Sequence, residues 1–287
     1  MRRLFTYPYI LWLAIFVIAP LLLVVFFAVT GTDTYGNTYF TLQNMGQFFE
    51  GIIDDQPFFQ RIYVVITMRS LRLALQTAVI CFILGYPLAY ILASKGFRNK
   101  PFLIFLFIMP MWMNFLVRTY GWMSILERNG IMNNFLRLLN LPTIDIMFTD
   151  SAVLLGMVYN FLPFMVLPIY TSLTKMDKRI IEAAQDLGAN PRNVFLRVVF
   201  PLSLPGVVSG ITMVFMPAAA TFIIPNLLGG GQFFLLGNLV EQQFMLAGNW
   251  HFGSAVAVVM IILMIVSTFI LSRFDRQEEV SEGGMRL

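Results

Sequence analysis

The chain has 287 residues, of which 58% are hydrophobic and only 12% are charged. A soluble domain is nearer half apolar and about a quarter charged, so this composition excludes a protein that faces water on all sides. The net charge of +4 does not indicate nucleic-acid binding, because the sequence has neither a nucleic-acid motif nor a basic surface interleaved with aromatic residues. We therefore expect an integral membrane protein.

Apolar stretches long enough to cross a bilayer occur along the whole chain, since a spanning helix needs about 20 apolar residues. The first is too long for the core of a signal peptide and no cleavage site follows it, so we interpret it as a permanent helix. The sequence also allows the second to begin as early as Ile62. An all-α protein with six membrane-spanning helices is predicted, at residues 9–29, 73–93, 101–120, 151–170, 204–225 and 252–272.

The segments outside these spans also carry predictions. After the fifth span, glycines at 229–231 break the chain, and we expect residues 229–251 to fold back against the protein on the outer side. The end of the chain, 277–287, is rich in Glu, Gly and Ser and is expected to be disordered. The expected divisions are 1–60, with the first helix and an outer loop; 61–273, the five-helix core; and 274–287, a cytoplasmic tail.

Basic residues predict the orientation. Most of the 19 Lys and Arg residues fall in the N-terminal segment, at 95–100, at 175–197 and at 273–286. Cytoplasmic segments carry the excess of Lys and Arg in membrane proteins. Both termini and the segment 175–201 are therefore expected on the cytoplasmic side.

The segment 175–201 predicts two short helices joined by a tight turn. Asp177 can cap the first helix, and Gly188 supplies the left-handed residue that closes it. Asn190 can cap the second helix, with Pro191 at its first position. The segment is therefore a compact helical loop between the fourth and fifth spans.

The first of these two helices has one apolar face. Ala183 and Ala184 make the middle of the face flat, and charged side chains surround it. Such a face suits docking into a partner's groove, but it also suits a helix resting on the membrane or on its own bundle. The physics of the loop leaves both interpretations open. The apolar face consists of Ile180, Ala183, Ala184 and Leu187, and the charges around it are Lys178, Glu182, Asp186 and Arg192.

The loop resembles a known motif. The run Glu182-Ala183-Ala184, Gly188 after three further residues, and the later Val198, Phe200 and Pro201 resemble the E-A-A loop of ABC importer permeases. That pattern has Ile and Leu where this chain has Val198 and Phe200, and both exchanges keep the apolar character. In that family the loop is the coupling helix that docks into a cleft of the cytoplasmic ATPase. The resemblance implies the type I permease fold and, as coupling residues, Glu182, Ala183, Ala184, Asp186, Gly188 and Arg192.

A wider resemblance covers nearly the whole chain. Segments 84–90, 110–121, 158–168 and 226–230 are similar to the B-type permease of spermidine/putrescine importers. Close relatives of that family handle opines, iron or other cations, so those substrates remain alternatives. The resemblance implies a multi-pass protein of the bacterial inner membrane that works with a second homologous permease, two ATPase subunits and a periplasmic substrate-binding protein.

The sequence does not indicate that this chain is an enzyme or that it hydrolyses ATP itself. None of its four lysines follows a glycine, so there is no phosphate-cradling G-x-x-x-x-G-K-[ST] loop, and ATP and Mg are expected on the partner ATPase. His251 is the only histidine, so no metal cluster, catalytic residue or resident cofactor is expected. A self-sufficient channel or secondary transporter is the rival interpretation, but no carboxylate lies in the middle of a predicted span.

A path for polyamines should combine aromatic faces with hydrogen-bond acceptors, because a polyamine is an elongated cation with apolar methylene segments. Trp and Tyr are also enriched at membrane interfaces, so each aromatic candidate could serve packing alone. The candidates near mid-membrane or the outer mouth are Trp112, Asn114, Tyr120, Tyr159, Asn160, Asn226 and Glu241.

Overall fold

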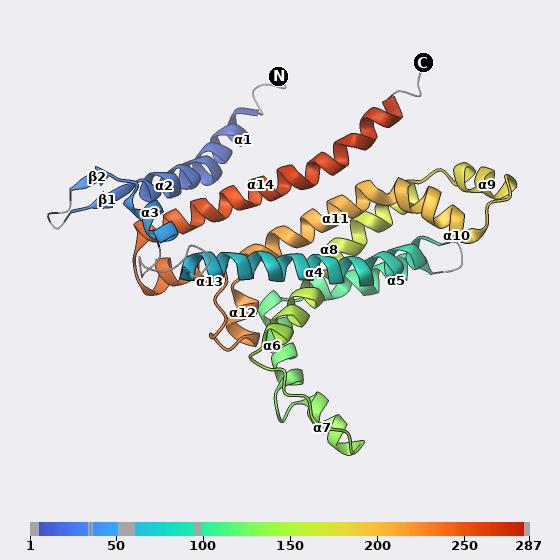
Figure 1. Cartoon of the computed structure of the whole chain (residues 1–287), viewed down its shortest axis with the longest axis horizontal. Helices are drawn as coiled ribbons and strands as arrows, with labels where there is room; N and C mark the ends of the chain where they lie inside the picture. Colours follow the sequence, from blue (N-terminus) through green and yellow to red (C-terminus); the bar gives the residue numbers. More distant parts are fainter. Residues whose placement is uncertain (1–5, 34, 36, 51–60, 95–98, 284–287) are drawn as a thin grey trace. The chain divides into compact units, whose positions relative to one another are not determined.

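The computed structural model describes residues 6–33, 35, 37–50, 61–94 and 99–283, and it is helical over most of that length (Figure 1). The residues form two compact units, one from 1–69 and 234–265 and the other from 70–233 and 266–287. The basic residues Lys95 and Arg98, used above for the orientation, lie outside the described residues. The divisions 1–60, 61–273 and 274–287 remain predictions.

The first unit begins with the predicted first span. It consists of α1 (Thr6–Leu13), a π-helical turn η1 (Ala14–Ile18) and α2 (Ala19–Ala28). Residues Pro8–Ala28 are long and apolar enough to cross a membrane. Pro20 lies at the start of α2 and has no N–H to give to the carbonyl four residues earlier, which favours the wider turn before it.

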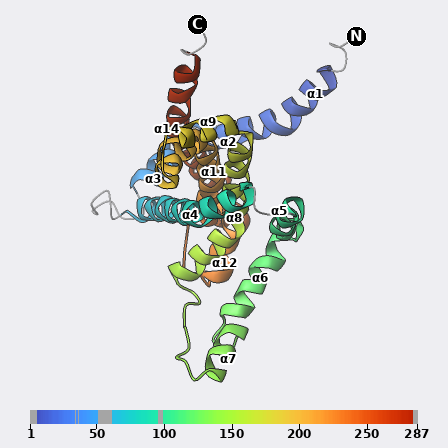
Figure 2. The same ribbon diagram turned by 90° about the vertical axis from the view of Figure 1, so that its right-hand side faces the viewer.

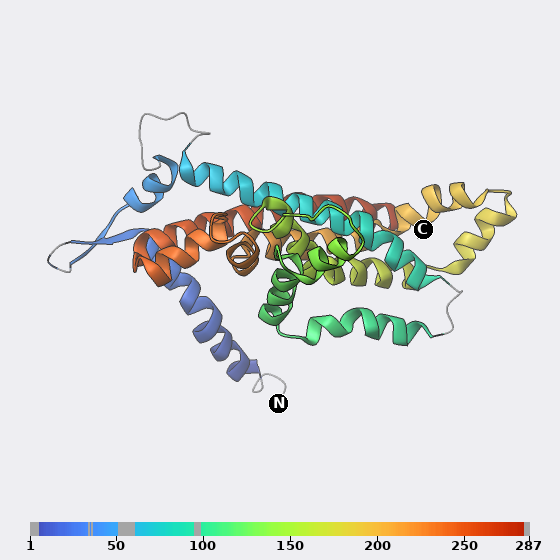
Figure 3. The ribbon, with the colours of Figure 1, turned by 90° about the horizontal axis from the view of Figure 1, so that it is seen from below.

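A small hairpin, which the sequence did not predict, follows α2 (Figure 3). Strands β1 (Thr30–Thr32) and β2 (Thr38–Phe40) pair antiparallel, with Thr30 opposite Phe40. Helix α3 (Gln43–Glu50) comes next, and Asn44 donates from Nδ2 to the carbonyl oxygen of Thr30 at 2.8 Å. This bond ties α3 to the base of the hairpin.

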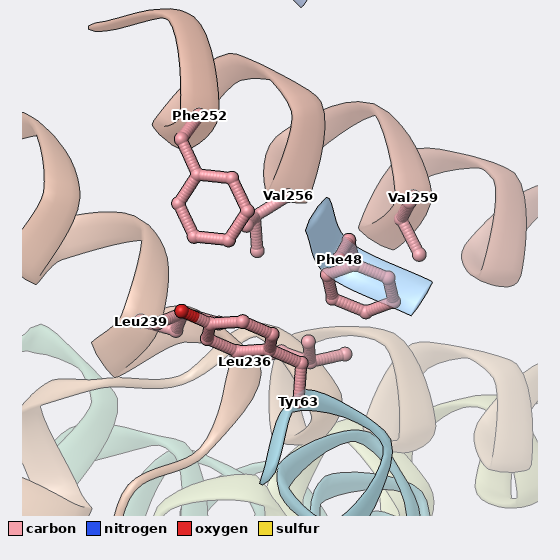
Figure 4. Packing of buried hydrophobic residues seen from close by; sticks show 7 residues of the cluster. All are labelled: Phe48, Tyr63, Leu236, Leu239, Phe252, Val256 and Val259. Carbon is pink, nitrogen blue, oxygen red and sulfur yellow. The ribbon is translucent and has the colours of Figure 1, made fainter. Parts of the chain in front are cut away.

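The core of the first unit gathers side chains from distant parts of the sequence (Figure 4). They come from α3, from the start of α4 (Ile62–Ala93), from α13 (Leu236–Glu241) and from α14 (Trp250–Gly283). A π-helical turn η5 (Gln242–Leu246) separates α13 from α14. The packing of Leu236 and Leu239 confirms that the segment 229–251 folds back against the protein, and its place on the outer side stays a prediction. The cluster consists of Phe48, Tyr63, Leu236, Leu239, Phe252, Val256 and Val259.

The second unit contains most of α4 and the helices from α5 to α12. Their bounds are α5 Lys100–Ile108, the 3₁₀ turn η3 Met109–Trp112, α6 Phe115–Leu126, α7 Ile131–Leu138, α8 Asp150–Lys175, α9 Lys178–Asp186, α10 Pro191–Val194, the π turn η4 Phe195–Val199, α11 Phe200–Ala220 and α12 Ile223–Leu228.

Helices α8 and α11 form the central pair of this unit and run side by side (Figure 1). Their backbones approach closely at Gly206 and Gly210, a G-x-x-x-G spacing typical of membrane helices. A Cβ atom at Gly206 would lie only 2.8 Å from the carbonyl oxygen of Pro168, and one at Gly210 would lie 2.8 Å from the Sδ of Met165. Gly85 of α4 also packs against α8, at Met165 and Val166.

The predicted third span is not one straight helix, which corrects the range 101–120. The chain bends by 92° between η3 and α6 (Figure 2). Met113 is extended, with ψ 147°, and the side chain of Asn114 caps α6 with a hydrogen bond from the Leu116 N–H. In the described part of the chain, five helices are long and apolar enough to span a bilayer, or six if this bent pair counts as one span.

The fifth and sixth spans also differ from their predicted bounds. The fifth runs through α10, η4 and α11 from Pro191 to Ala220, and ends where Thr221 turns extended before α12. The sixth, α14, continues to Gly283, so the expected disorder is wrong for residues 277–283. No Gly or Pro interrupts the sequence between Gly253 and Gly283, and the Arg and Glu residues there are good helix formers. The second span does begin at Ile62, as the sequence allowed.

Candidate functional site

The loop between α8 and α11 has the local geometry that its sequence predicts. The Oδ1 atom of Asp177 accepts a hydrogen bond from the Arg179 N–H at 3.0 Å, which caps α9. Gly188 has φ +79° and closes α9 in the left-handed conformation. The N–H groups of Gly188 and Ala189 bond to the carbonyls of Gln185 and Ala184, which is the Schellman arrangement of a helix C-terminus.

The outgoing arm of the loop starts at a second cap. The Oδ1 atom of Asn190 accepts from the Asn193 N–H at 2.8 Å, and Pro191 occupies the first helical position. From there α10, η4 and α11 form one helical run down to Ala220. The loop is therefore joined to a spanning helix without an intervening flexible segment.

Most of the apolar face of α9 is left uncovered by the residues that the structure describes. The side chain of Leu187 is 89% exposed and that of Ile180 is 45% exposed. Around the face, Glu182, Asp186 and Arg192 are also exposed. The alternative in which this face rests on the chain's own bundle is therefore wrong, whereas a partner protein or the membrane surface both fit the exposure.

Two of the three aromatic candidates of the translocation path, Trp112 and Tyr120, lie on η3 and α6, on either side of the bend. Trp112 ends η3 with 75% of its surface exposed, and its ring packs edge-on against Phe105 with centroids 5.6 Å apart. Asn114 serves as the cap of α6, so its Oδ1 atom is engaged by the backbone. Tyr120 lies exposed on α6.

The remaining candidates of this unit lie on α8 and α12, which pack against each other and against α6. The ring of Tyr159 stacks edge-on with that of Trp122 at 5.2 Å, so Trp122 belongs to the same surface although the sequence reasoning missed it. Asn160 is buried, its Nδ2 bonds to the Gly156 carbonyl, and its Oδ1 has no hydrogen-bond partner among the described residues. Asn226 is exposed on α12.

The structure thus brings Tyr159, Asn160 and Asn226 onto three packed helices together with Tyr120. Glu241, at the end of α13, belongs to the first unit and is not placed with them. His251 also belongs to the first unit, and its Nδ1 atom lies 3.1 Å from the carbonyl oxygen of Phe27. Among the described residues no three His, Cys, Asp or Glu side chains lie close enough to hold a metal ion.

Solved structures show where this helical arrangement recurs. A bacterial ABC transporter involved in the import of the acidic polysaccharide alginate matches with a TM-score of 0.77, covering 96% of each chain at 13% identity. The MetNI methionine ABC transporter matches with a TM-score of 0.54 over 75% of this chain and 94% of that one, at 19% identity. The fold is that of an ABC importer permease.

Sequence comparison gives the family. The model of the binding-protein-dependent transport system inner membrane component matches residues 85–278. The spermidine/putrescine transport system permease protein PotB of Salmonella typhimurium is 37% identical over 92% of this chain and 90% of that protein. PotB of Escherichia coli K12 is 36% identical over 92% and 94%, and the inner membrane ABC transporter permease protein YdcU of the same organism is 33% identical over 69% and 68%.

The chain belongs to the family of binding-protein-dependent transport system inner membrane components. It is a transport subunit and not an enzyme, and it is a multi-pass membrane protein that works within an ABC transporter.

Proposed function

We propose that this chain forms half of the path by which a bacterial ABC importer takes up a polyamine of the spermidine/putrescine class. The observation that carries the proposal is the identity of 36–37% to spermidine/putrescine permeases over 92% of the chain. The chemistry of the candidate path supports it, because exposed aromatic rings and amide groups suit a cation with apolar segments. Opines, iron and other small cations are the alternative substrates.

The proposed partners are a second homologous permease, two cytoplasmic ATPase subunits that bind ATP and Mg, and a periplasmic substrate-binding protein. The exposed apolar face of α9 supports docking of the ATPase at the loop 175–201. The coupling residues would be Glu182, Ala183, Ala184, Asp186, Gly188 and Arg192. Purification from native membranes should recover the chain with an ATPase and a second permease, whereas a self-sufficient transporter would be recovered alone.

The orientation of the proposed importer places both termini and the loop in the cytoplasm, in keeping with the distribution of Lys and Arg. On a Cys81→Ala background, a membrane-impermeant thiol reagent applied to intact spheroplasts should label Tyr35→Cys but not Asn193→Cys. Both positions are exposed on the chain, so a difference in labelling reports the side of the membrane and not burial. The reverse labelling pattern would invert the topology and remove the ATPase from reach of the loop.

The proposed substrate and the role of Trp112 are tested in one uptake assay. Cells that depend on this importer should accumulate labelled spermidine, and excess unlabelled putrescine should compete, whereas an opine or ferric chelate should not. Trp112→Ala should lower uptake about fivefold or more, since a desolvated cation–π contact contributes roughly 1–2 kcal/mol. Trp112→Phe should keep much of the activity, because it retains an aromatic face.

The control in this assay is the amount of assembled importer. Trp112 is largely exposed, so its truncation should leave assembly unchanged. If Trp112→Ala instead removes the chain from the membrane, the side chain serves packing and not the path. If spermidine does not accumulate in the unmodified strain but another cation does, the polyamine assignment is wrong while the importer class stands.

A further inference from the structure

Four aromatic side chains gather where the outgoing arm of the coupling loop meets α4. We call this group the aromatic clamp; it consists of Tyr86 and Tyr90 of α4, Phe195 of η4 and Phe200 of α11. The ring of Tyr86 lies 5.9 Å from that of Phe195 and 5.5 Å from that of Phe200, and Tyr90 meets Phe195 edge-on at 5.3 Å. Tyr86 is only 6% exposed, so it is the buried centre of the clamp.

A chain of hydrogen bonds locks the centre of the clamp. The hydroxyl of Tyr86 lies 2.9 Å from the Oγ of Ser203, a residue with no exposed surface. Ser203 donates its single hydroxyl hydrogen to the carbonyl oxygen of Phe200 at 2.8 Å. Tyr86 must therefore be the donor to Ser203. In such apolar surroundings a satisfied polar chain is strengthened and fixes one arrangement of the helices that carry it.

The clamp includes the residues at both ends of an irregular turn, η4. Phe195 begins the π turn η4 and Phe200 follows it, and the Phe200 N–H closes the turn by bonding to the Phe195 carbonyl. Pro201 explains the irregularity, because it has no N–H to offer the carbonyl of Arg197 four residues before it. Single π turns occur frequently at functional sites. This π turn begins five residues after Asn190, the N-cap of α10.

Among the described residues, α4 contacts the outgoing arm of the loop at the clamp, and it contacts α8 at Met165. A displacement of the loop can therefore reach α4 through the clamp or through α8. The run from Pro191 to Ala220 is continuous, so a shift of α9 and α10 is carried into η4. There it must either move Tyr86 together with Phe195 and Phe200 or break the bond to Ser203. Because the Tyr86–Ser203–Phe200 hydrogen bonds resist breaking, we expect Tyr86 to move together with Phe195 and Phe200.

We propose that Tyr86 is a positioning residue that ties α4 to the coupling loop, so that α4 moves with the loop when the ATPase closes. The inference rests on the proposed function, in which the loop 175–201 docks with the ATPase. The loop is covalently joined to α8 and α11. The contact at Tyr86 would transmit its movement to a third spanning helix, α4.

The test uses the whole importer in proteoliposomes, with the binding protein and labelled spermidine, and measures spermidine imported per ATP hydrolysed. Tyr86→Phe keeps the ring and its contacts but removes the donor, and Ser203→Ala removes the acceptor. Each should lower the ratio about three- to tenfold, the value of one buried hydrogen bond, while the ATPase stays bound and active. The double variant should be no worse than either single variant, because both remove the same bond.

Tyr90→Phe is the matched control, since it removes a phenol hydroxyl one turn later on α4 from an exposed side chain. It should leave the ratio near that of the unmodified importer. An unchanged ratio in Tyr86→Phe or Ser203→Ala would overturn the proposal, as would a parallel loss of import and ATP hydrolysis, because a merely structural role predicts that pattern.

The experiments distinguish an error in the proposal for Tyr86 from an error in the proposed function. If Gly188→Val stops import while Tyr86→Phe keeps the normal ratio, the loop is the coupling element and only the clamp proposal is wrong. If Gly188→Val and Glu182→Lys both import spermidine normally, docking of the ATPase at the loop is wrong while polyamine import stands. If the unmodified importer does not accumulate spermidine, the proposed function itself is overturned.

Discussion

Replacing Gly188 with valine should reduce import at least about tenfold while the chain still reaches the membrane. Gly188 has φ +79°, and a side chain in the left-handed region costs about 1–2 kcal/mol, most for a β-branched residue. The strain would open the Schellman turn and change the angle between α9 and α10. The ATPase would then meet a displaced docking face and should be lost during purification or hydrolyse ATP without transport.

The matched variant is Gly188→Asn. A Cβ at this position meets no atom within 4 Å beyond the adjacent residues, so a clash of the Cβ with the rest of the chain does not explain a loss of import. Asparagine tolerates the left-handed conformation and should keep most of the import activity. Glu182→Lys, which reverses a charge beside the apolar face, should reduce ATPase retention like Gly188→Val. Normal uptake by both Gly188→Val and Glu182→Lys would show that the loop is not the coupling element.

Replacing Gly206 should act on the fold itself, with the largest effect on assembly. Even alanine would place its Cβ 2.6 Å from the Cβ of Ser172 and 2.8 Å from the carbonyl oxygen of Pro168. The backbone of α8 cannot move aside without disturbing its other contacts, so overpacking should cost about 1–3 kcal/mol. Gly206→Leu should leave little assembled importer, measured as complex recovered from membranes and as its melting temperature in detergent.

Gly121→Ala provides the control for this prediction. Gly121 also lies inside a helix, α6, but a Cβ there meets no atom within 4 Å. Alanine should therefore be neutral or stabilise the helix by up to about 1 kcal/mol through its better helix propensity. Equal melting temperatures for Gly206→Ala and Gly121→Ala would contradict the close α8–α11 contact at Gly206.

The sequence determined the features that depend on neighbouring residues. The apolar stretches predicted the spans, because a bilayer selects for composition over about 20 consecutive residues. The caps at Asp177 and Asn190 and the left-handed Gly188 were predicted correctly, because a side chain or a missing Cβ acts on a backbone only two or three residues away. The E-A-A motif in the same loop, with Gly188, also indicated the family of ABC importer permeases.

Only the tertiary structure decided where helices bend, end and meet. Pro110 and Asn114 are signals for a break in the third span, but composition alone gave no reason to prefer a 92° bend over a straight helix. The burial of Asn160 follows from the packing of α8 and not from its polarity. Tyr86 and Ser203 lie 117 residues apart, and their hydrogen bond exists because the close α8–α11 pair and α4 bring them together. Such a contact arises from the packing of whole helices, which no short window of the sequence contains.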